Sequence, residues 1–169
     1  GSQTGRMIYN PETLDLTSLI NETINLLQYQ AKIKQIRLIS DTEPVLSVFA
    51  DVNMTRTVLR NLVSNAIKFT HRNGFVKISA YKIQSGQEPV VSFVEISVTD
   101  NGVGISKENL EKLFMLDHKV KTHGTEEEMG SGLGLILCKE LVGKNKGYMN
   151  ITSEENVGST VSFTLPEKN

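Results

Sequence analysis

Residues 61–69 read Asn61-Leu62-Val63-Ser64-Asn65-Ala66-Ile67-Lys68-Phe69, and this stretch decides how the rest of the chain is interpreted. Its apolar residues recur at intervals typical of an amphipathic helix. Asn61, Asn65 and Lys68 are four and three positions apart, so they project from about the same face. An amide oxygen suits Mg²⁺ and an ammonium group suits a phosphate, but a solvated helix face accounts for this stretch equally well when it is taken alone.

A second stretch, Asp100-Asn101-Gly102-Val103-Gly104-Ile105, follows a predicted strand. A carboxylate at the end of a strand can accept a hydrogen bond from the exocyclic amine of adenine. The two glycines, Gly102 and Gly104, let the backbone approach a ring closely. Asp-Asn-Gly is also a common turn sequence, in which the aspartate only closes the turn.

A third stretch, Gly130-Ser131-Gly132-Leu133-Gly134-Leu135, opens a predicted helix over residues 132–145. Free backbone N–H groups and the positive end of a helix dipole bind phosphate. The stretch is not a P-loop, because no Lys-Ser/Thr pair follows it, and a polar loop rather than a strand precedes it, which excludes a dinucleotide-binding fingerprint. The signatures of a protein-kinase catalytic loop are absent from the sequence. Together, the three stretches predict an ATP site.

The composition indicates an ordinary globular chain. Its 169 residues are 38% hydrophobic and 22% charged, which fits one domain with a core. A net charge of -1, no Lys/Arg run and no Trp argue against a nucleic-acid partner. No apolar run is long enough to cross a bilayer, and there is no signal peptide. The single cysteine, Cys138, lies in an apolar stretch, so we expect a buried reduced thiol.

The order of the predicted elements indicates an α+β two-layer sandwich, with helices packed on one face of a mixed, mostly antiparallel sheet. We expect Thr17, Asp51 and Ser106 to cap helices. Residues 116–131 are polar and charged, which is typical of a mobile loop. We expect strands at 7–16, 36–40, 45–50, 75–83, 90–99, 147–153 and 159–165, and helices at 17–34, 51–70, 107–115 and 132–145.

Taken in order, these segments resemble the catalytic and ATP-binding domain of sensor histidine kinases. That domain belongs to the ATPase superfamily that also contains DNA gyrase B, MutL and the heat-shock chaperones. The resemblance covers nearly the whole chain after about Asn10 and implies the Bergerat ATP-binding fold. The segments similar to the family's N, G1, F and G2 boxes and to its last strand are Asn61–Phe69, Asp100–Ile105, Leu113-Phe114, Gly130–Leu135 and Gly158–Pro166.

The resemblance implies a role for each matching residue. Asn65 would coordinate Mg²⁺, and Asn61 and Lys68 would act near the phosphates as catalytic residues. Asp100 would bind the adenine amine, and residues 114–131 would form a lid over the nucleotide. The implied ATP-binding set is Asn61, Asn65, Lys68, Asp100, Gly102, Gly104, Ile105, Phe114, Gly130, Ser131, Gly132, Leu133, Gly134, Leu135 and Thr160.

One residue type distinguishes this site from those of hydrolysing relatives. Those members place a glutamate, which activates water, one turn before the metal-binding Asn, whereas this chain has Asn61. An amide cannot act as a general base, so the resemblance implies that ATP is kept for transfer. The acceptor would be a histidine on a separate two-helix domain. His71, His118 and His123 do not lie in such a helical setting, so we expect no phosphoacceptor in this chain.

We therefore expect the ATP-binding catalytic domain of a two-component sensor histidine kinase, with ATP and Mg²⁺ as cofactors. Its partners would be its own dimerisation and phosphoacceptor domain and a response regulator, with no nucleic acid and no direct membrane contact. Gly1-Ser2 resembles an expression scar, which leaves a single domain over residues 3–169. We expect this fragment to be a cytoplasmic monomer and its parent a homodimer, which the sequence leaves free to be anchored in a membrane. Lys119 or Lys121 could reach the γ-phosphate when the lid closes.

Two alternatives stay open. The first is an anti-sigma-factor-type serine kinase of the same superfamily, against which the predicted N-terminal strand and helix at residues 8–34 weigh. The second is a scaffold that binds nucleotide without transferring phosphate. The intact Asn65 and Asp100, together with both glycine-rich stretches, weigh against such a degenerate site.

Overall fold

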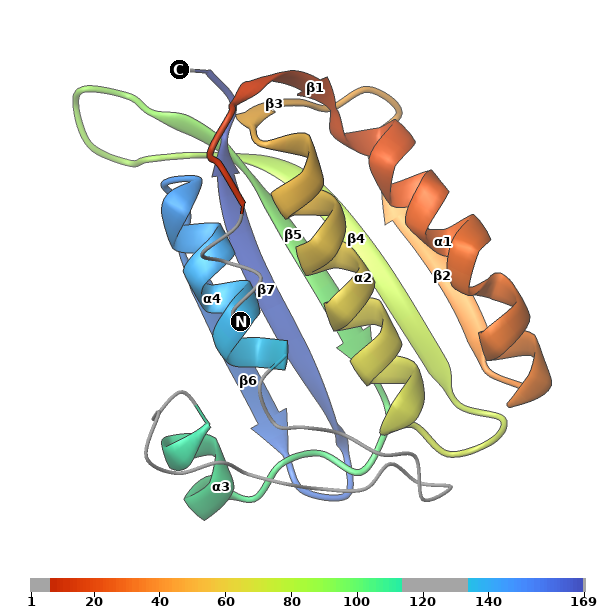
Figure 1. The fold of residues 1–169 in the computed structure, drawn as a ribbon. Helices are drawn as coiled ribbons and strands as arrows, with labels where there is room; N and C mark the ends of the chain where they lie inside the picture. Colours follow the sequence, from red (N-terminus) through yellow and green to blue (C-terminus); the bar gives the residue numbers. More distant parts are fainter. Residues whose placement is uncertain (1–6, 114–133, 169) are drawn as a thin grey trace.

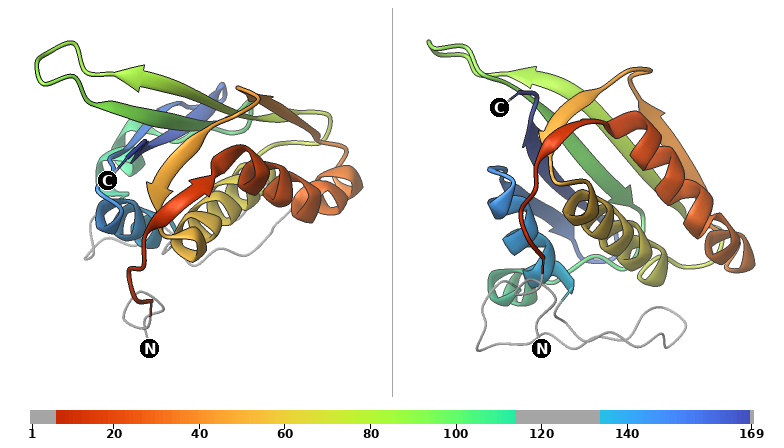
Figure 2. Two further views of the ribbon diagram at one scale, coloured as in Figure 1. Left: turned by 90° about the horizontal axis from the view of Figure 1, so that it is seen from above. Right: turned by 45° about the horizontal axis from the view of Figure 1, so that its top comes forward.

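The computed structural model describes residues 7–113 and 134–168 of the chain. A five-stranded sheet forms one layer, and helices α1, α2 and α4 lie side by side on one of its faces (Figures 1 and 2). The α+β two-layer architecture expected from the sequence is confirmed. The elements are β1 (Glu12–Asp15), α1 (Leu16–Ile33), β2 (Arg37–Thr42), β3 (Ser47–Ala50), α2 (Val52–Lys68), β4 (Phe75–Gln84), β5 (Ser92–Asp100), α3 (Lys107–Lys112), α4 (Gly134–Lys144), β6 (Met149–Glu154) and β7 (Gly158–Pro166).

The sheet is mixed, as predicted. Its strand order is β2-β4-β5-β7-β6, in which only β2 and β4 run parallel. The hairpin expected around residues 84–89 is formed by β4 and β5, and it extends beyond the helix layer (Figure 1). The two strands expected around residues 41–44 belong to different sheets, because β2 pairs with β4 whereas β3 pairs with β1.

The core lies between the sheet and the helices. The alternation of side chains along β5 places one polar residue on the same face of the sheet as the core. In β5, Val94, Ile96 and Val98 are buried against the helix layer. Asp100 continues this alternation at the end of the strand, so its side chain faces the helix side of the sheet. Cys138 of α4 is buried as predicted, and burial raises the pKa of its thiol to about 12.

The opposite face of the sheet carries pairs of hydroxyl groups. The Oγ atoms of Ser97 and Ser162 lie 2.8 Å apart, and the Oγ1 atoms of Thr99 and Thr160 lie 3.1 Å apart. No described helix covers this face (Figure 2). An antiparallel sheet tolerates this arrangement, because one face can pack on the core while the other stays solvated.

Helices α1, α2 and α3 each begin at a side chain that accepts a backbone hydrogen bond. The carboxylate of Asp15 accepts one from the Ser18 N–H at 3.1 Å, so α1 begins before the predicted cap. The prediction of Thr17 as that cap is wrong, since Thr17 lies within the first turn of α1. The predicted caps Asp51 of α2 and Ser106 of α3 are confirmed.

A buried polar cluster joins the start of α2 to the end of α4. The Asp51 N–H donates to Oδ1 of Asn145 at 2.8 Å, and the Asn145 amide donates to the Leu141 carbonyl at 2.8 Å. The Asp51 carboxylate also accepts from the Asn10 and Met54 N–H groups. The buried polar groups of this cluster are therefore hydrogen-bonded, and they fix α2 relative to α4.

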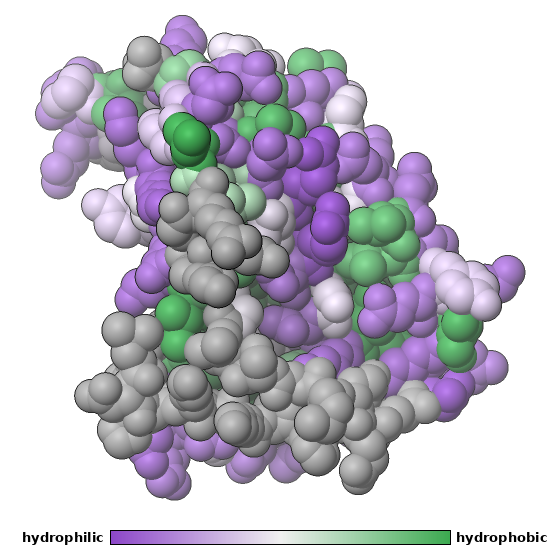
Figure 3. Space-filling view, in the orientation of Figure 1, coloured by the Kyte–Doolittle hydropathy of each residue, from purple (hydrophilic) through white to green (hydrophobic). Residues whose placement is uncertain are grey.

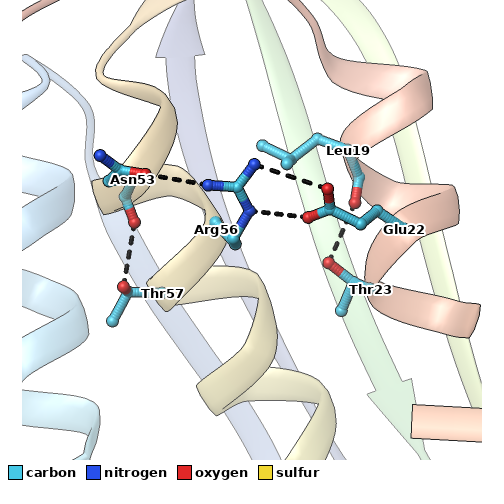
Figure 4. A network of polar contacts seen from close by, with 6 residues as sticks. All are labelled: Leu19, Glu22, Thr23, Asn53, Arg56 and Thr57. Carbon is cyan, nitrogen blue, oxygen red and sulfur yellow. Dashed lines mark hydrogen bonds and ion pairs between the residues drawn. The ribbon is translucent and has the colours of Figure 1, made fainter. Parts of the chain in front are cut away.

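An exposed ion pair joins α1 to α2 on the other side (Figure 4). Nε of Arg56 lies 2.7 Å from a carboxylate oxygen of Glu22, and Nη1 of Arg56 donates to Asn53 Oδ1 at 2.9 Å. The hydrogen bond from Arg56 lowers the pKa of Glu22. Solvent screens such pairs, so apolar packing contributes most of the α1–α2 contact.

Most of the surface in Figure 3 is hydrophilic, but hydrophobic atoms gather over α1. The exposed apolar side chains of this helix are Leu26, Tyr29 and Ile33. They lie on the far side of α2 from α4, because α2 is the middle helix of the layer (Figure 1). Within the described part of the chain, none of the helices has the length and apolar character needed to span a bilayer.

Candidate nucleotide-binding site

The amide side chains of α2 meet the first residue of α4. A Cβ added at Gly134 would lie 3.5 Å from Nδ2 of Asn65 and 3.9 Å from Oδ1 of Asn61. The Asn61 amide nitrogen donates to the Thr57 carbonyl at 3.0 Å, which leaves its oxygen on the side of Gly134. The structure thus places the two asparagines next to Gly134, the first residue of α4.

A buried lysine donates hydrogen bonds to the last turn of α2. Lys34, only 5% exposed, donates from Nζ to the carbonyls of Ile67 at 3.0 Å and Lys68 at 2.9 Å. The Lys68 ammonium lies 5.2 Å from the centre of the Phe69 ring. The Phe69 carbonyl accepts from the Val103 N–H at 3.0 Å, so the end of α2 is bonded to the turn after β5.

Asp100 lies where this turn begins. Its Oδ1 accepts from the Gly102 N–H at 2.8 Å. Burial raises the pKa of the Asp100 carboxyl, while hydrogen bonds from the backbone N–H groups of Gly102 and Ser159 oppose that rise. A carboxylate that is partly desolvated, and that uses only some of its lone pairs in hydrogen bonds, is suited to accept a further hydrogen bond from a ligand.

Only glycine fits at two positions of the turn. A Cβ at Gly102 would lie 2.1 Å from the Phe69 carbonyl oxygen. Gly104 has φ of +68°, and a Cβ there would lie 2.1 Å from the Glu154 carbonyl oxygen. The turn is therefore held between the end of α2 and the β6–β7 hairpin, and the close contacts that require glycine at both positions are contacts with the protein's own backbone.

The structure does not bring Thr160 to Asp100. The Thr160 hydroxyl pairs with Thr99 on the solvated face, and the residue opposite Asp100 in the β5–β7 ladder is Ser159. Successive residues of a strand point to opposite faces, so a shift of one residue changes the face. Counting back in steps of two from the buried Phe163 would have selected Ser159 from the sequence.

The remaining predicted residues divide between the described segments and the rest of the chain. The Ile105 N–H donates to Ser153 Oγ at 2.8 Å, and Leu135 packs against the hydrophobic core. His71 is exposed in the turn after α2. The predicted residues that lie outside the described segments are Phe114, Gly130, Ser131, Gly132 and Leu133, together with the lid at 114–131, including His118, Lys119, Lys121 and His123.

The described residues fit a Mg²⁺ ion that takes most of its ligands from phosphate and water. Residues 7–113 and 134–168 contain no group of three or more His, Cys, Asp or Glu that could hold a metal ion. Mg²⁺ tolerates few protein ligands when phosphate oxygens and waters complete its shell. Asn65, whose amide nitrogen is the atom nearest Gly134, carries one neutral amide oxygen, and such a ligand fits an ion that arrives with a phosphate ligand.

Comparison with known families identifies the chain. The sequence model of the family described as "Histidine kinase-, DNA gyrase B-, and HSP90-like ATPase" matches residues 50–169, which is more than half of the chain. The chain belongs to this ATPase family. The matched region contains α2, the turn after Asp100 and the whole of β7, which are the elements that form the candidate site.

Curated relatives of this ATPase chain include sensor kinases. The non-motile and phage-resistance protein of Caulobacter vibrioides is 34% identical over 164 residues, covering 97% of this chain and 19% of that protein. The adaptive-response sensory kinase SasA of Prochlorococcus marinus is 33% identical over 167 residues, covering 98% of this chain and 43% of that protein. The chain therefore spans less than half the length of either relative.

Solved structures of histidine kinases share the fold. The nucleotide-free catalytic domain of the histidine kinase ThkA has a TM-score of 0.77 and 29% sequence identity, with 96% of this chain and 97% of that chain covered. Full-length ShkA in complex with AMPPNP has a TM-score of 0.76 and 25% identity, with 95% of this chain and 32% of that chain covered. Within the ATPase family, the chain thus has the fold of a histidine kinase catalytic domain.

Proposed function

We propose that this domain binds Mg·ATP and donates the γ-phosphoryl group to a histidine on a phosphoacceptor domain of its full-length protein. The observation that carries the proposal is the convergence of three features at one end of the fold. These are the Asn61–Asn65 face of α2, the partly desolvated Asp100 and the glycine turn bonded to both β6 and α2. The likeness to the ThkA catalytic domain supports this assignment.

Each residue would have a distinct role in nucleotide binding. The Asp100 carboxylate would accept from the exocyclic amine of adenine, and the base would lie beside the turn at Gly102 and Gly104, whose glycines let the turn pack tightly on the end of α2 and on β6. Asn65 would contribute an amide oxygen to Mg²⁺, and Lys68 would meet a phosphate as a point charge. The AMPPNP complex of ShkA supports a nucleoside triphosphate as the ligand.

The chemistry proposed for Asn61 is retention of ATP rather than hydrolysis. Its amide donates to the Thr57 carbonyl, and an amide cannot take a proton from water at neutral pH. The nucleophile would be an imidazole nitrogen of the acceptor histidine, which forms the new P–N bond while the bond to the β,γ-bridging oxygen breaks and ADP leaves. Positioning and charge stabilisation dominate such transfers.

The wider partners follow from the same proposal. A lid at residues 114–131 would close over the nucleotide, and the phosphoryl group would pass from the histidine to a response regulator. The names of relatives such as the sensory kinase SasA support this assignment. A dimeric full-length protein would place the acceptor histidine near the site.

The test measures binding first and transfer second. The chain should bind Mg·ATP in calorimetry, and the full-length protein given ATP labelled in its γ-phosphate should acquire an acid-labile label, as phosphohistidine does. Absence of Mg·ATP binding would refute the site. An acid-stable label on a partner protein would support a serine kinase instead, and binding without any labelling would support a nucleotide-binding scaffold.

A further inference from the structure

We propose that Ser153 is a positioning residue that turns the Ser159 hydroxyl into a hydrogen-bond acceptor toward the nucleotide base, and so favours a 6-amino purine over a 6-oxo purine. This inference rests on the proposed binding of ATP at Asp100. Ser153 lies near the end of β6, opposite Ser159 in the β6–β7 ladder. Ser159 in turn lies opposite Asp100 in the β5–β7 ladder.

The Ser153 hydroxyl has three close partners. Its Oγ lies 2.8 Å from the Ile105 nitrogen, 3.1 Å from the Gly158 carbonyl oxygen and 2.7 Å from Ser159 Oγ. The first contact bonds the turn after Asp100 to β6, and the other two bond Ser153 to the start of β7. Ser153 therefore joins the two segments that flank the Asp100 carboxylate.

Counting protons assigns the direction of each bond. A hydroxyl group has one proton to donate and two lone pairs to accept. The Ile105 N–H can only donate to Ser153, and the Gly158 carbonyl can only accept the Ser153 proton. With the single Ser153 proton donated to the Gly158 carbonyl, the third contact is a hydrogen bond in which the Ser159 hydroxyl donates to Ser153.

The Ser159 hydroxyl then has only lone pairs to offer a ligand. Side chains directly opposite in an antiparallel ladder have Cβ atoms about 5 Å apart, so Ser159 and Asp100 form one acceptor surface. Adenine presents an amino group with two N–H donors at its 6-position, and hypoxanthine presents a carbonyl oxygen there. The acceptor surface attracts the amine and opposes the carbonyl.

Removing the Ser153 hydroxyl would free the Ser159 proton. Ser159 could then rotate and donate to a 6-oxo group, so discrimination between the two bases should weaken. A matched control exists on the other face of the sheet, where Ser97 and Ser162 form a hydroxyl pair of 2.8 Å across β5 and β7. That pair has the same chemistry but lies on the face away from Asp100.

The experiment compares binding of Mg·ATP and Mg·ITP to the chain by calorimetry. Ser153→Ala should lower the ratio of ATP to ITP affinity about tenfold, the size expected for one hydrogen bond. Ser153→Thr retains the hydroxyl and should restore the ratio, and Ser162→Ala should leave it unchanged. A purely structural role for Ser153 would weaken both nucleotides by the same factor and leave the ratio as it was.

Two further results separate the inference from the proposed function. If the unaltered chain binds neither nucleotide, the ATP site itself is refuted. If it binds ATP but the ratio stays constant in Ser153→Ala, only the role of Ser153 is refuted. Ser159→Ala should lower the ratio as well, and the double variant should lower it no further. Should Ser153→Ala fail to fold, an unchanged ratio in Ser159→Ala overturns the inference.

Discussion

At the scale of one residue, Asp100 shows how a partly buried carboxylate can lower the stability of the fold. Burial raises the pKa of its carboxyl above the ordinary value of 3.8, so the folded chain binds that proton more tightly than the unfolded chain does. Protonated Asp100 therefore stabilises the folded chain. This contribution to the free energy of unfolding is fully present below the pKa that the carboxyl has in the unfolded chain, and it is lost as the pH rises through the higher pKa of the folded chain. At neutral pH the ionised carboxylate therefore destabilises the ligand-free fold.

The substitution Asp100→Asn should separate stability from function. We expect the thermal midpoint at pH 7 to rise by roughly 2–4 °C, because the buried charge is gone, and this gain should shrink as the pH falls toward about 4. Affinity for Mg·ATP should fall at least about tenfold, since the amide is a weaker acceptor than a carboxylate. Scanning calorimetry and titration calorimetry measure the two effects. A lower midpoint at pH 7 would show that the ionised carboxylate stabilises the fold instead.

Single residues also mark the limit of what the sequence could predict. Asp100, Gly102 and Gly104 were identifiable because an acidic residue and two closely spaced glycines directly follow an alternating strand. The sequence predicts Thr160 as the residue of β7 near Asp100, whereas the register of β7 places Ser159 opposite Asp100 and Thr160 on the other face of the sheet. Tertiary packing decides which alternate residues of a strand face the core. From the sequence alone, one of two adjacent hydroxyl residues is therefore easily assigned to the wrong face.

At the scale of elements, Lys34 connects the end of α1 to the end of α2. Lys34→Met keeps the length of the side chain but removes the donors to the Ile67 and Lys68 carbonyls. We expect the free energy of unfolding to fall by about 1–3 kcal/mol, because two carbonyls at a helix end lose a charged donor. Urea unfolding measures this, with the exposed Lys32→Met as the control. Equal stability of the two variants would refute the role.

The elements themselves were largely predictable, but their partners were not. Apolar periodicity predicts α1 and α2, and the caps Asp51 and Ser106 follow from local chemistry. The sequence predicts a strand over residues 7–16 and a helix that begins at Thr17, whereas β1 spans Glu12–Asp15 and its last residue, Asp15, is the cap of α1. The pairing of β2 with β4 depends on contacts far apart in the sequence.

At the scale of the whole molecule, the candidate site links segments that fold together but are distant in the chain. The asparagines of α2 meet the start of α4, while the turn after β5 is bonded to α2 and to the β6–β7 hairpin. A ligand bound among these segments contacts only the folded arrangement. By mass action, it must therefore raise the stability of the entire domain.

Mg·ATP at about 100 times its dissociation constant should add about 2.7 kcal/mol to the free energy of unfolding, which corresponds to roughly 5–10 °C in the thermal midpoint. Chelation of Mg²⁺ should remove most of this shift, because the amide of Asn65 is a neutral ligand and the described segments offer no carboxylate cluster to retain the ion. Differential scanning fluorimetry can measure the shift with ATP alone, with Mg·ATP and with chelator. At the same Mg·ATP concentration, Asp100→Asn should reduce the shift to about half or less, as a loss of affinity of at least about tenfold requires, while Ser162→Ala keeps it, because Asp100 faces the helix side of the sheet and Ser162 faces the other side. An equal shift in both variants would place the nucleotide elsewhere on the molecule.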